Sequence, residues 1–166
     1  SAISIRSTRW SRPVPQAEPA AAPPPKLVVW DLDGTLWQGT LGEDVDVGVF
    51  DSARRSIAAL DRGGILQSIA SRCPRALAWP RLRAEALDHY FLASQFGVDC
   101  KAAAIAEIAA TLDIDPASIL FIDDLSVERA WVESRLPSVR CVDATQRGEL
   151  ATLANAVVTP ESRRRR

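Results

Sequence analysis

The segment 31–35, with the sequence DLDGT, is the part of this chain best suited to chemistry, because it directly follows the apolar run 27–30. Asp31 and Asp33 are two positions apart, so both can project near the end of a strand while Leu32 points the other way. Paired carboxylates in that place suit a hard, oxygen-liganded cation such as Mg²⁺, which pairs with substrate phosphate. A carboxylate can also attack phosphorus and form an aspartyl phosphate. The same pattern occurs in turns that cap a helix, so taken alone it leaves both interpretations open.

A second acidic pair, Asp123 and Asp124, follows the apolar run 119–122 in the same manner. Four carboxylates crowded at one sheet edge would repel one another strongly without a cation. The repulsion between these carboxylates therefore predicts a bound metal ion, as the motif itself does. The alternative is that this pair caps the helix expected near residue 127.

Ser71 and Lys101 are two further polar residues at the boundaries of expected elements. Ser71 ends the apolar stretch 65–70 and offers a hydroxyl to a phosphoryl oxygen, although a plain turn residue would look the same. Lys101 is one of only two lysines and opens a helix, where the helix dipole does not favour a cation. A compact ammonium group aimed at phosphate would explain it, and an exposed surface lysine is the alternative.

Strand and helix patterns alternate after residue 26. The apolar runs predict strands over 27–31, 65–70, 119–122 and 139–142, and a short additional strand within 90–96. The helical spacing of apolar residues predicts helices over 50–62, 75–88, 101–112, 127–135 and 147–156, with Ser126 as the cap of the fourth. Such alternation indicates an α/β fold, a Rossmann-like parallel sheet with helices on both faces. Ligands of these sheets bind beyond the carboxyl ends of the strands, where the acidic pairs fall.

The length of 166 residues suits one domain between two short terminal segments. Residues 1–25 hold six of the eleven prolines, so we expect a disordered, extended leader. Residues 26–160 form the expected catalytic domain, and residues 161–166 a basic tail. The leader carries +2 and the four C-terminal arginines +4, which leaves −7 on residues 26–162 within a total of −1. An acidic body argues against a nucleic-acid partner.

The three cysteines, Cys73, Cys100 and Cys141, are odd in number and form no CxxC pair. This pattern predicts neither a disulfide framework nor a zinc site, so we expect a reducing compartment, the cytoplasm. No apolar run approaches the length of a membrane span, and we expect no membrane partner.

The polar segments, taken in order, resemble the four motifs of the haloacid dehalogenase (HAD) superfamily of phosphoryl-transfer enzymes. Segment 31–35 matches the first motif, DxDGT, whereas Ser71 matches the second, Lys101 the third and the pair at 123–124 the fourth. The resemblance extends over residues 26–143. No large insertion separates the first three motifs, so the resemblance implies a HAD core without a large cap domain, and an open site.

The resemblance also implies a role for each side chain. Asp31 would be the nucleophile, and Asp33 would protonate the leaving group and later activate water. Mg²⁺ would be held by Asp31, by the backbone carbonyl of Asp33, and by Asp123 or Asp124. Contacts to the phosphoryl oxygens are implied for Thr35, Ser71, Arg72 and Lys101.

A finer resemblance is to the FkbH-like proteins of HAD subfamily IIIC and to small stand-alone magnesium-dependent phosphatases. It lies in the segments 28–44, 68–72 and 121–130. It implies a phosphatase that acts on a small phosphorylated metabolite in natural-product biosynthesis. The chain departs from the family at Cys100, where a proline usually precedes the motif-three lysine.

Two alternatives stay open. FkbH-like proteins load a glyceryl group onto an acyl carrier protein, so the resemblance also allows glyceryl transfer from 1,3-bisphosphoglycerate to such a partner. That reaction would need a thiol near the site, and Cys73 and Cys100 are the candidates because they adjoin motifs two and three. A non-catalytic binding module on a HAD fold is the other alternative, against which the intact Asp31, Asp33 and Lys101 speak.

Overall fold

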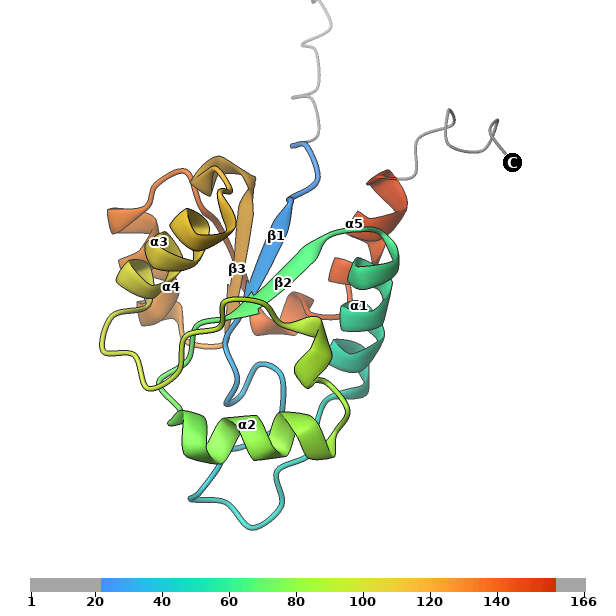
Figure 1. Ribbon diagram of the computed structural model, residues 1–166, viewed down its shortest axis with the longest axis vertical. Coiled ribbons are helices and arrows are strands. Elements are labelled where there is room, and N and C mark those ends of the chain that lie inside the picture. The colour runs from blue at the N-terminus through green and yellow to red at the C-terminus, as the bar shows by residue number, and fades with distance from the viewer. Residues whose placement is uncertain (1–21, 158–166) are drawn as a thin grey trace, which may run out of the picture.

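Four parallel strands form the centre of the protein in a computed structural model that describes residues 22–157 (Figure 1). They are β1 (Leu27–Trp30), β2 (Leu66–Ile69), β3 (Ile119–Asp123) and β4 (Arg140–Asp143), in the order β2-β1-β3-β4. The chain runs from β1 to β2 on one side and later returns to β3 on the other side of β1. The direction of winding therefore reverses between β1 and β3, which creates a switch point at their carboxyl ends.

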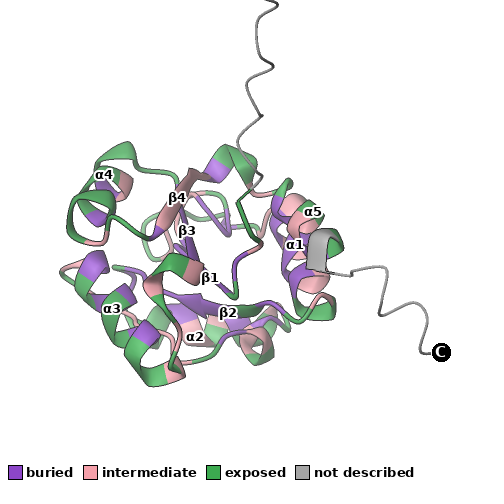
Figure 2. Ribbon diagram, turned by 90° about the horizontal axis from the view of Figure 1, so that it is seen from above, coloured by how far each residue is buried: buried purple, intermediate pink, exposed green. Residues whose placement is uncertain are grey.

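Helices cover both faces of this sheet (Figures 1 and 2). On one face lie α1 (Asp51–Arg62) and α5 (Leu150–Val157), and on the other lie α3 (Lys101–Leu112) and α4 (Ser126–Arg135). Helix α2 (Arg75–Ala84) lies beyond the carboxyl ends of the strands, beside the loop that joins β1 to α1 (Figure 1). Three short 3-10 turns complete the elements, at Asp88–Tyr90, Pro116–Ser118 and Ala144–Gln146. The predicted α/β class, with helices on both faces and no large cap domain in residues 22–157, is confirmed.

The central strand β1 is buried along its whole length because helices shield both of its faces. Val28 and Trp30 pack in the core that includes Ile57 of α1, whereas Val29 packs in the opposite core with Ile105 of α3. Burial of both faces explains why this strand reads as one continuous apolar run. It also fixes where the chain must leave the sheet, which is at Asp31.

Three expectations about local structure were wrong. No strand forms within 90–96; two isolated bridges to the edge of β2 take its place, because the backbone of Ala93 turns to a φ of 51°. The helix predicted over 75–88 ends at Ala84, since Ala86 adopts a φ of 55°. Ser126 is not the cap of α4 but its first residue; the Asp123 carboxylate accepts the N–H of Leu125 just before the helix.

Most of the Pro-rich leader, residues 1–21, lies outside the described residues, as does the basic tail 161–166. Residues 22–25 form neither helix nor strand, and Pro25 is buried, so packing begins one residue before Lys26. None of the helices in residues 22–157 has the length and apolar character needed to cross a bilayer.

Candidate active site

A cavity of about 390 Å³ opens at the switch point, where β1 and β3 end side by side. Pairing of Trp30 with Ile122 places Asp31 next to Asp123, the last residue of β3. The cavity is lined by seven residues that the sequence had singled out, Asp31, Asp33, Ser71, Arg72, Cys73, Lys101 and Asp124. It is also lined by residues without a predicted role, among them Gly39, Thr40, Leu125 and Glu128.

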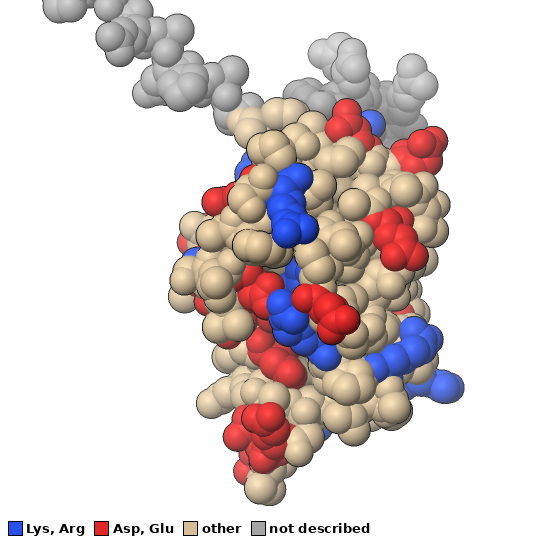
Figure 3. All heavy atoms as spheres, turned by 90° about the vertical axis from the view of Figure 1, so that its left-hand side faces the viewer, with Lys and Arg blue, Asp and Glu red and all other residues tan. Residues whose placement is uncertain are grey.

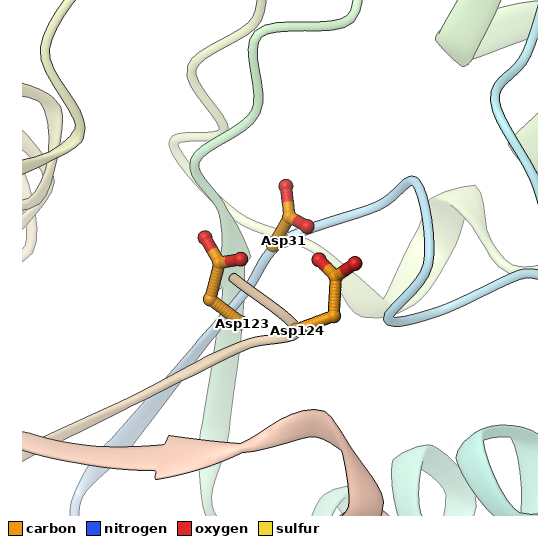
Figure 4. A group of neighbouring side chains, drawn as sticks. All are labelled: Asp31, Asp123 and Asp124. Atoms are coloured by element: carbon orange, nitrogen blue, oxygen red, sulfur yellow. The ribbon is translucent and has the colours of Figure 1, made fainter. Parts of the chain in front are cut away.

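Three carboxylates converge at the floor of this cavity (Figure 4). Asp31, Asp123 and Asp124 each offer an oxygen, and these atoms lie within 4.8 Å of one another. Asp31 and Asp123 are buried, whereas Asp124 is exposed. Burial raises the pKa of Asp31 to about 7, the ammonium group of Lys101 opposes that rise, and the charge of Asp123 adds to it. Burial likewise raises the pKa of Asp123.

Lys101 lies between two of these carboxylates. Its Nζ is 2.9 Å from Oδ1 of Asp31 and 2.5 Å from Oδ2 of Asp123, and only 3% of its side chain is exposed. Burial alone would lower the pKa of Lys101, but the two carboxylates raise it above its ordinary value. The structure thus shows how an ammonium group reaches the site: Lys101, the first residue of α3, extends its side chain to the ends of β1 and β3.

One ammonium group does not balance three carboxylates. The cluster keeps an excess of negative charge, and all of its donors are hard carboxylate oxygens. Such a donor set fits a hard divalent cation, which would relieve the repulsion that burial intensifies. Asp33 stands apart, because its carboxylate is not a member of this group of three.

The loop after β1 is fixed by contacts to the loop after β3. Gly34 has a φ of 75°, and a side chain there would collide with the carboxylate of Asp124. The hydroxyl of Thr35 donates to Oδ2 of Asp31 at 3.1 Å and accepts the N–H of Asp124 at 3.1 Å. Thr35 is fully buried and does not line the cavity, so the structure places it behind the aspartates rather than facing a ligand.

A second contact to this loop comes from far along the chain. The guanidinium group of Arg147 donates to the carbonyls of Thr35 at 2.9 Å and Gly34 at 3.2 Å, and it lies 3.9 Å from the ring centre of Phe50. Sequence reasoning missed Arg147, because its partners lie more than 100 residues away and are backbone atoms.

Asp33 is held by the segment that follows it. The indole N–H of Trp37 donates to its Oδ1 at 2.6 Å, and the N–H of Leu41 donates to the same oxygen at 3.1 Å. Trp37 is fully buried and contributes no surface to the cavity. This arrangement orients one carboxylate oxygen from behind while Asp33 lines the cavity.

The opposite wall is formed by Ser71, Arg72 and Glu128. The Ser71 hydroxyl oxygen accepts the N–H of Cys73 at 3.1 Å. Arg72 donates from Nε to Glu128 at 2.6 Å and from Nη1 to the carbonyl of Asp99 at 3.0 Å. Glu128 is 7% exposed, and sequence reasoning gave it no role, although a buried carboxylate on a helix needs a cationic partner.

No family model matches the chain, and no curated protein matches its sequence. Solved structures resemble its fold. The N-terminal part of protein BF1531 from Bacteroides fragilis, which contains a phosphatase domain complexed with Mg, has a TM-score of 0.68 at 22% identity. That match covers 80% of this chain and 40% of the B. fragilis chain, so this chain spans less than half of that neighbour.

Two further neighbours are matched over most of their length. The 3-deoxy-D-manno-octulosonate 8-phosphate phosphatase of Moraxella catarrhalis, in complex with magnesium ion, phosphate ion and KDO, has a TM-score of 0.59 at 19% identity. It is covered over 88% of its chain by 81% of this one. A HAD-superfamily hydrolase of Ehrlichia chaffeensis has a TM-score of 0.62 at 13% identity, with 79% of this chain and 98% of that chain covered.

The protein has the HAD-like α/β fold.

Within this HAD-like fold, the cysteines proposed as acyl carriers have opposite environments. Cys73 lines the cavity, but burial, aided by the charges of Asp33 and Asp31, raises the pKa of its thiol to about 11. Cys100 precedes α3 and has a pKa below its ordinary value, first because the N–H of Ala103 stabilises the thiolate. Cys100 does not line the cavity. Cys100 thus has the more acidic thiol but lies outside the cavity, whereas Cys73 lines the cavity but has the less acidic thiol.

Proposed function

We propose that the protein is a Mg²⁺-dependent phosphatase or phosphotransferase that acts on a small phosphorylated metabolite through an aspartyl phosphate at Asp31. The observation that carries this proposal is the buried group of Asp31, Lys101 and Asp123 at the floor of an open cavity, with Asp124 beside it. Two of the neighbours in fold are phosphatases whose structures contain magnesium, which supports the same reaction class.

Asp31, Asp123 and Asp124 would hold the cation, together with the backbone carbonyl of Asp33 that the HAD resemblance adds. Bound there, Mg²⁺ supplies charge neutralisation for these carboxylates and for the phosphoryl oxygens. Lys101 favours the ionised form of Asp31 and so opposes the rise in pKa that burial causes, and the hydroxyl of Thr35 restrains the second oxygen of the same carboxylate. Asp31 is therefore oriented on one oxygen by an ammonium group and on the other by a hydroxyl.

In the first step, an oxygen of Asp31 bonds to phosphorus while the bond from phosphorus to the leaving-group oxygen breaks. Asp33 donates its proton to that oxygen, for which the contacts from Trp37 and Leu41 orient it. In the second step, Asp33 accepts a proton from water, and the water oxygen bonds to phosphorus. Inorganic phosphate leaves, and Asp31 is regenerated as a carboxylate.

The hydroxyl of Ser71, the guanidinium group of Arg72 and the ammonium group of Lys101 are donors on cavity-lining residues that would contact the phosphoryl oxygens. The cavity adjoins no separate cap domain within residues 22–157, so substrate selection falls to its own rim. Arg72 is fixed to that rim by Glu128 and Asp99, which places a planar cation where an anionic substrate enters.

The test is a phosphatase screen over small phosphorylated metabolites with and without Mg²⁺, with Asp31→Asn as the matched control. We expect release of inorganic phosphate that requires both the metal and Asp31. If no metabolite is turned over under either condition, the alternative of a non-catalytic binding module on a HAD fold gains support.

The finer hypothesis, a subfamily IIIC role in natural-product biosynthesis, rests on the resemblance of segments 28–44, 68–72 and 121–130 to FkbH-like proteins. Full FkbH-like activity would be glyceryl transfer from 1,3-bisphosphoglycerate to an acyl carrier protein. Cys73 in the cavity wall is the thiol best placed for that reaction. Because the pKa of Cys73 is about 11, few molecules carry the thiolate near neutral pH. We therefore expect intact-mass measurement to show phosphate release without a protein adduct. A glyceryl adduct that Cys73→Ala removes would establish the transferase instead.

A further inference from the structure

Helix α4 exposes two large apolar side chains where it begins next to the cavity, although its Val132 is buried. Its first turn buries the carboxylate of Glu128, whereas the neighbouring Val127 and Trp131, which share one side of the helix at a spacing of four, are 70% and 48% exposed. Leu125, just before the helix, is 50% exposed. Three of the seven exposed large apolar residues in the described part of the chain therefore fall within seven positions. Gathered apolar exposure of this kind marks a binding surface.

The apolar strip Leu125–Val127–Trp131 leads from the cavity into a second hollow of about 390 Å³. Leu125 lines the catalytic cavity, and Val127 and Trp131 line the second hollow together with Asp99. Figure 3 faces the α3 and α4 side of the molecule, where basic and acidic side chains meet near the middle of the face, with uncharged surface between them and the other charged side chains.

Arg72 and Glu128 form the border between the two hollows, because both residues line both of them. Their ion pair of 2.6 Å and the bond from Arg72 to the Asp99 carbonyl hold that border in place. The indole of Trp131 is also held, since the guanidinium carbon of Arg135 lies 4.4 Å from its ring centre. The second hollow is thus lined by side chains that neighbouring residues hold in place, and one of them is aromatic.

We propose that this hollow is a subsite for the leaving group of the substrate, and that this group carries an aromatic or otherwise apolar portion that packs on Trp131 and Val127. The proposal rests on the proposed function, because it takes the phosphoryl group to lie over Asp31. A phosphate ester whose ester oxygen faces Asp33 must direct its organic group toward the rim, and the apolar part of that rim is the strip. The hollow is concave and within the size range of ligand pockets, about 300–1,000 Å³, which favours a small-molecule group over a flat protein surface.

The kinetic test compares two substrates, 2-naphthyl phosphate and acetyl phosphate, in the Mg²⁺-loaded full chain. For Trp131→Ala, we expect the ratio of kcat/KM for the two substrates to fall about tenfold against the naphthyl ester, mainly through KM. The control is Leu66→Ala, which removes a similarly exposed apolar side chain at the opposite end of the sheet and should leave the ratio within about twofold. An unchanged ratio in Trp131→Ala, or an equal fall in the control, overturns the subsite.

A binding measurement separates failure of the subsite from failure of the proposed function. The probe is 2-naphthylmethylphosphonate, which cannot be hydrolysed, with methylphosphonate as the small control. The indole N–H signal of Trp131, assigned with Trp131→Phe, should shift on titration with the naphthyl compound and not with the control. If no ester is turned over but this signal shifts, the hydrolase proposal fails, and the hollow is a binding site for an apolar group but not a leaving-group subsite. If esters are turned over and the signal does not move, the subsite is wrong.

Discussion

In the floor of the cavity, charged side chains are buried and bonded to one another, whereas at its rim apolar side chains face solvent. Lys101 and Asp123 are 3% and 0% exposed and form an ion pair, while Trp131 and Leu125 at the rim are about half exposed. Burial makes the floor sensitive to every charge, because an unpaired buried ion costs several kcal/mol. The rim tolerates change at much lower cost. Under the proposed function, the floor determines the chemistry and the rim determines the substrate.

The largest effect should come from replacing the nucleophile in the floor. We expect Asp31→Asn to reduce turnover to the background of the assay while preserving the fold, because the amide has the same shape but cannot attack phosphorus. Steady-state phosphate release and circular dichroism would measure the two properties. Activity within about tenfold of the wild type would rule out Asp31 as the nucleophile.

Replacement of Asp33 should have a smaller effect of a different kind. We expect Asp33→Asn to slow hydrolysis by roughly 10²–10⁴-fold, the usual contribution of a general acid or base, while some phosphoenzyme still forms. Rapid-quench labelling would detect the phosphoenzyme, and substrates with poor leaving groups should be affected most. Unchanged rates with a poor leaving group would contradict the assigned role.

The floor should also respond to the metal in its stability. Because the carboxylate group carries excess negative charge, Mg²⁺ at about a hundred times its Kd should stabilise the folded state by about 2.7 kcal/mol. Thermal melts with Mg²⁺ and with EDTA would measure the gain. Asp124→Asn is the matched control, since Asp124 is exposed and its replacement should reduce the gain without disturbing the core. Equal melting temperatures with and without Mg²⁺ would argue against a site in the floor.

The raised pKa of Asp31 also predicts that the stability of the metal-free protein depends on pH. Its pKa rises from 3.8 to about 7 in the folded protein without metal, so between these values the folded state binds a proton that the unfolded state has lost. The contribution of Asp31 to stability therefore falls as pH rises through that window. Without metal, the free energy of unfolding of the wild type relative to Asp31→Asn should decrease from about pH 4 to pH 7 and then level off.

Much of the floor could be predicted from the sequence, because strand ends and side-chain types are local properties. The apolar run before Asp31 and the one before Asp123 fix two strand ends, and parallel pairing brings those ends together. Lys101 was identified by its unusual place at a helix start. The same local reasoning misassigned Ser126 as a cap, because the Asp123 carboxylate already binds the N–H of Leu125.

The rim could not be predicted in this way, because its roles depend on contacts between distant segments. Glu128 in the first turn of a helix looks like an ordinary exposed acid beside a helix dipole, and only its pairing with Arg72 shows otherwise. Arg147 supports the loop after β1 across more than 100 residues of sequence. The exposure of Trp131 follows from how α4 packs, which the weak apolar spacing of that helix leaves open.

At the rim, variants of Arg72 and Glu128 test whether Glu128 acts on substrate binding by orienting Arg72. We expect Arg72→Ala to raise KM about tenfold, the value of one charge-assisted hydrogen bond, with little change in kcat. Glu128→Gln should raise KM in the same direction, because it weakens the ion pair that orients Arg72. In the double variant, the loss should equal that of Arg72→Ala alone. Additive losses would show that Glu128 contacts substrate by itself.

The smallest effect is expected from removal of the N-terminal segment. Residues 1–25 are rich in proline and lack the apolar periodicity that packing requires. Pro25 is nevertheless buried, so the informative truncation removes residues 1–21 and keeps the packed boundary. We expect its melting temperature and its rate of phosphate release to match those of the full chain. A clear fall in melting temperature would show that the leader packs on the domain. A change in KM alone, with stability retained, would instead place the leader near the rim of the cavity.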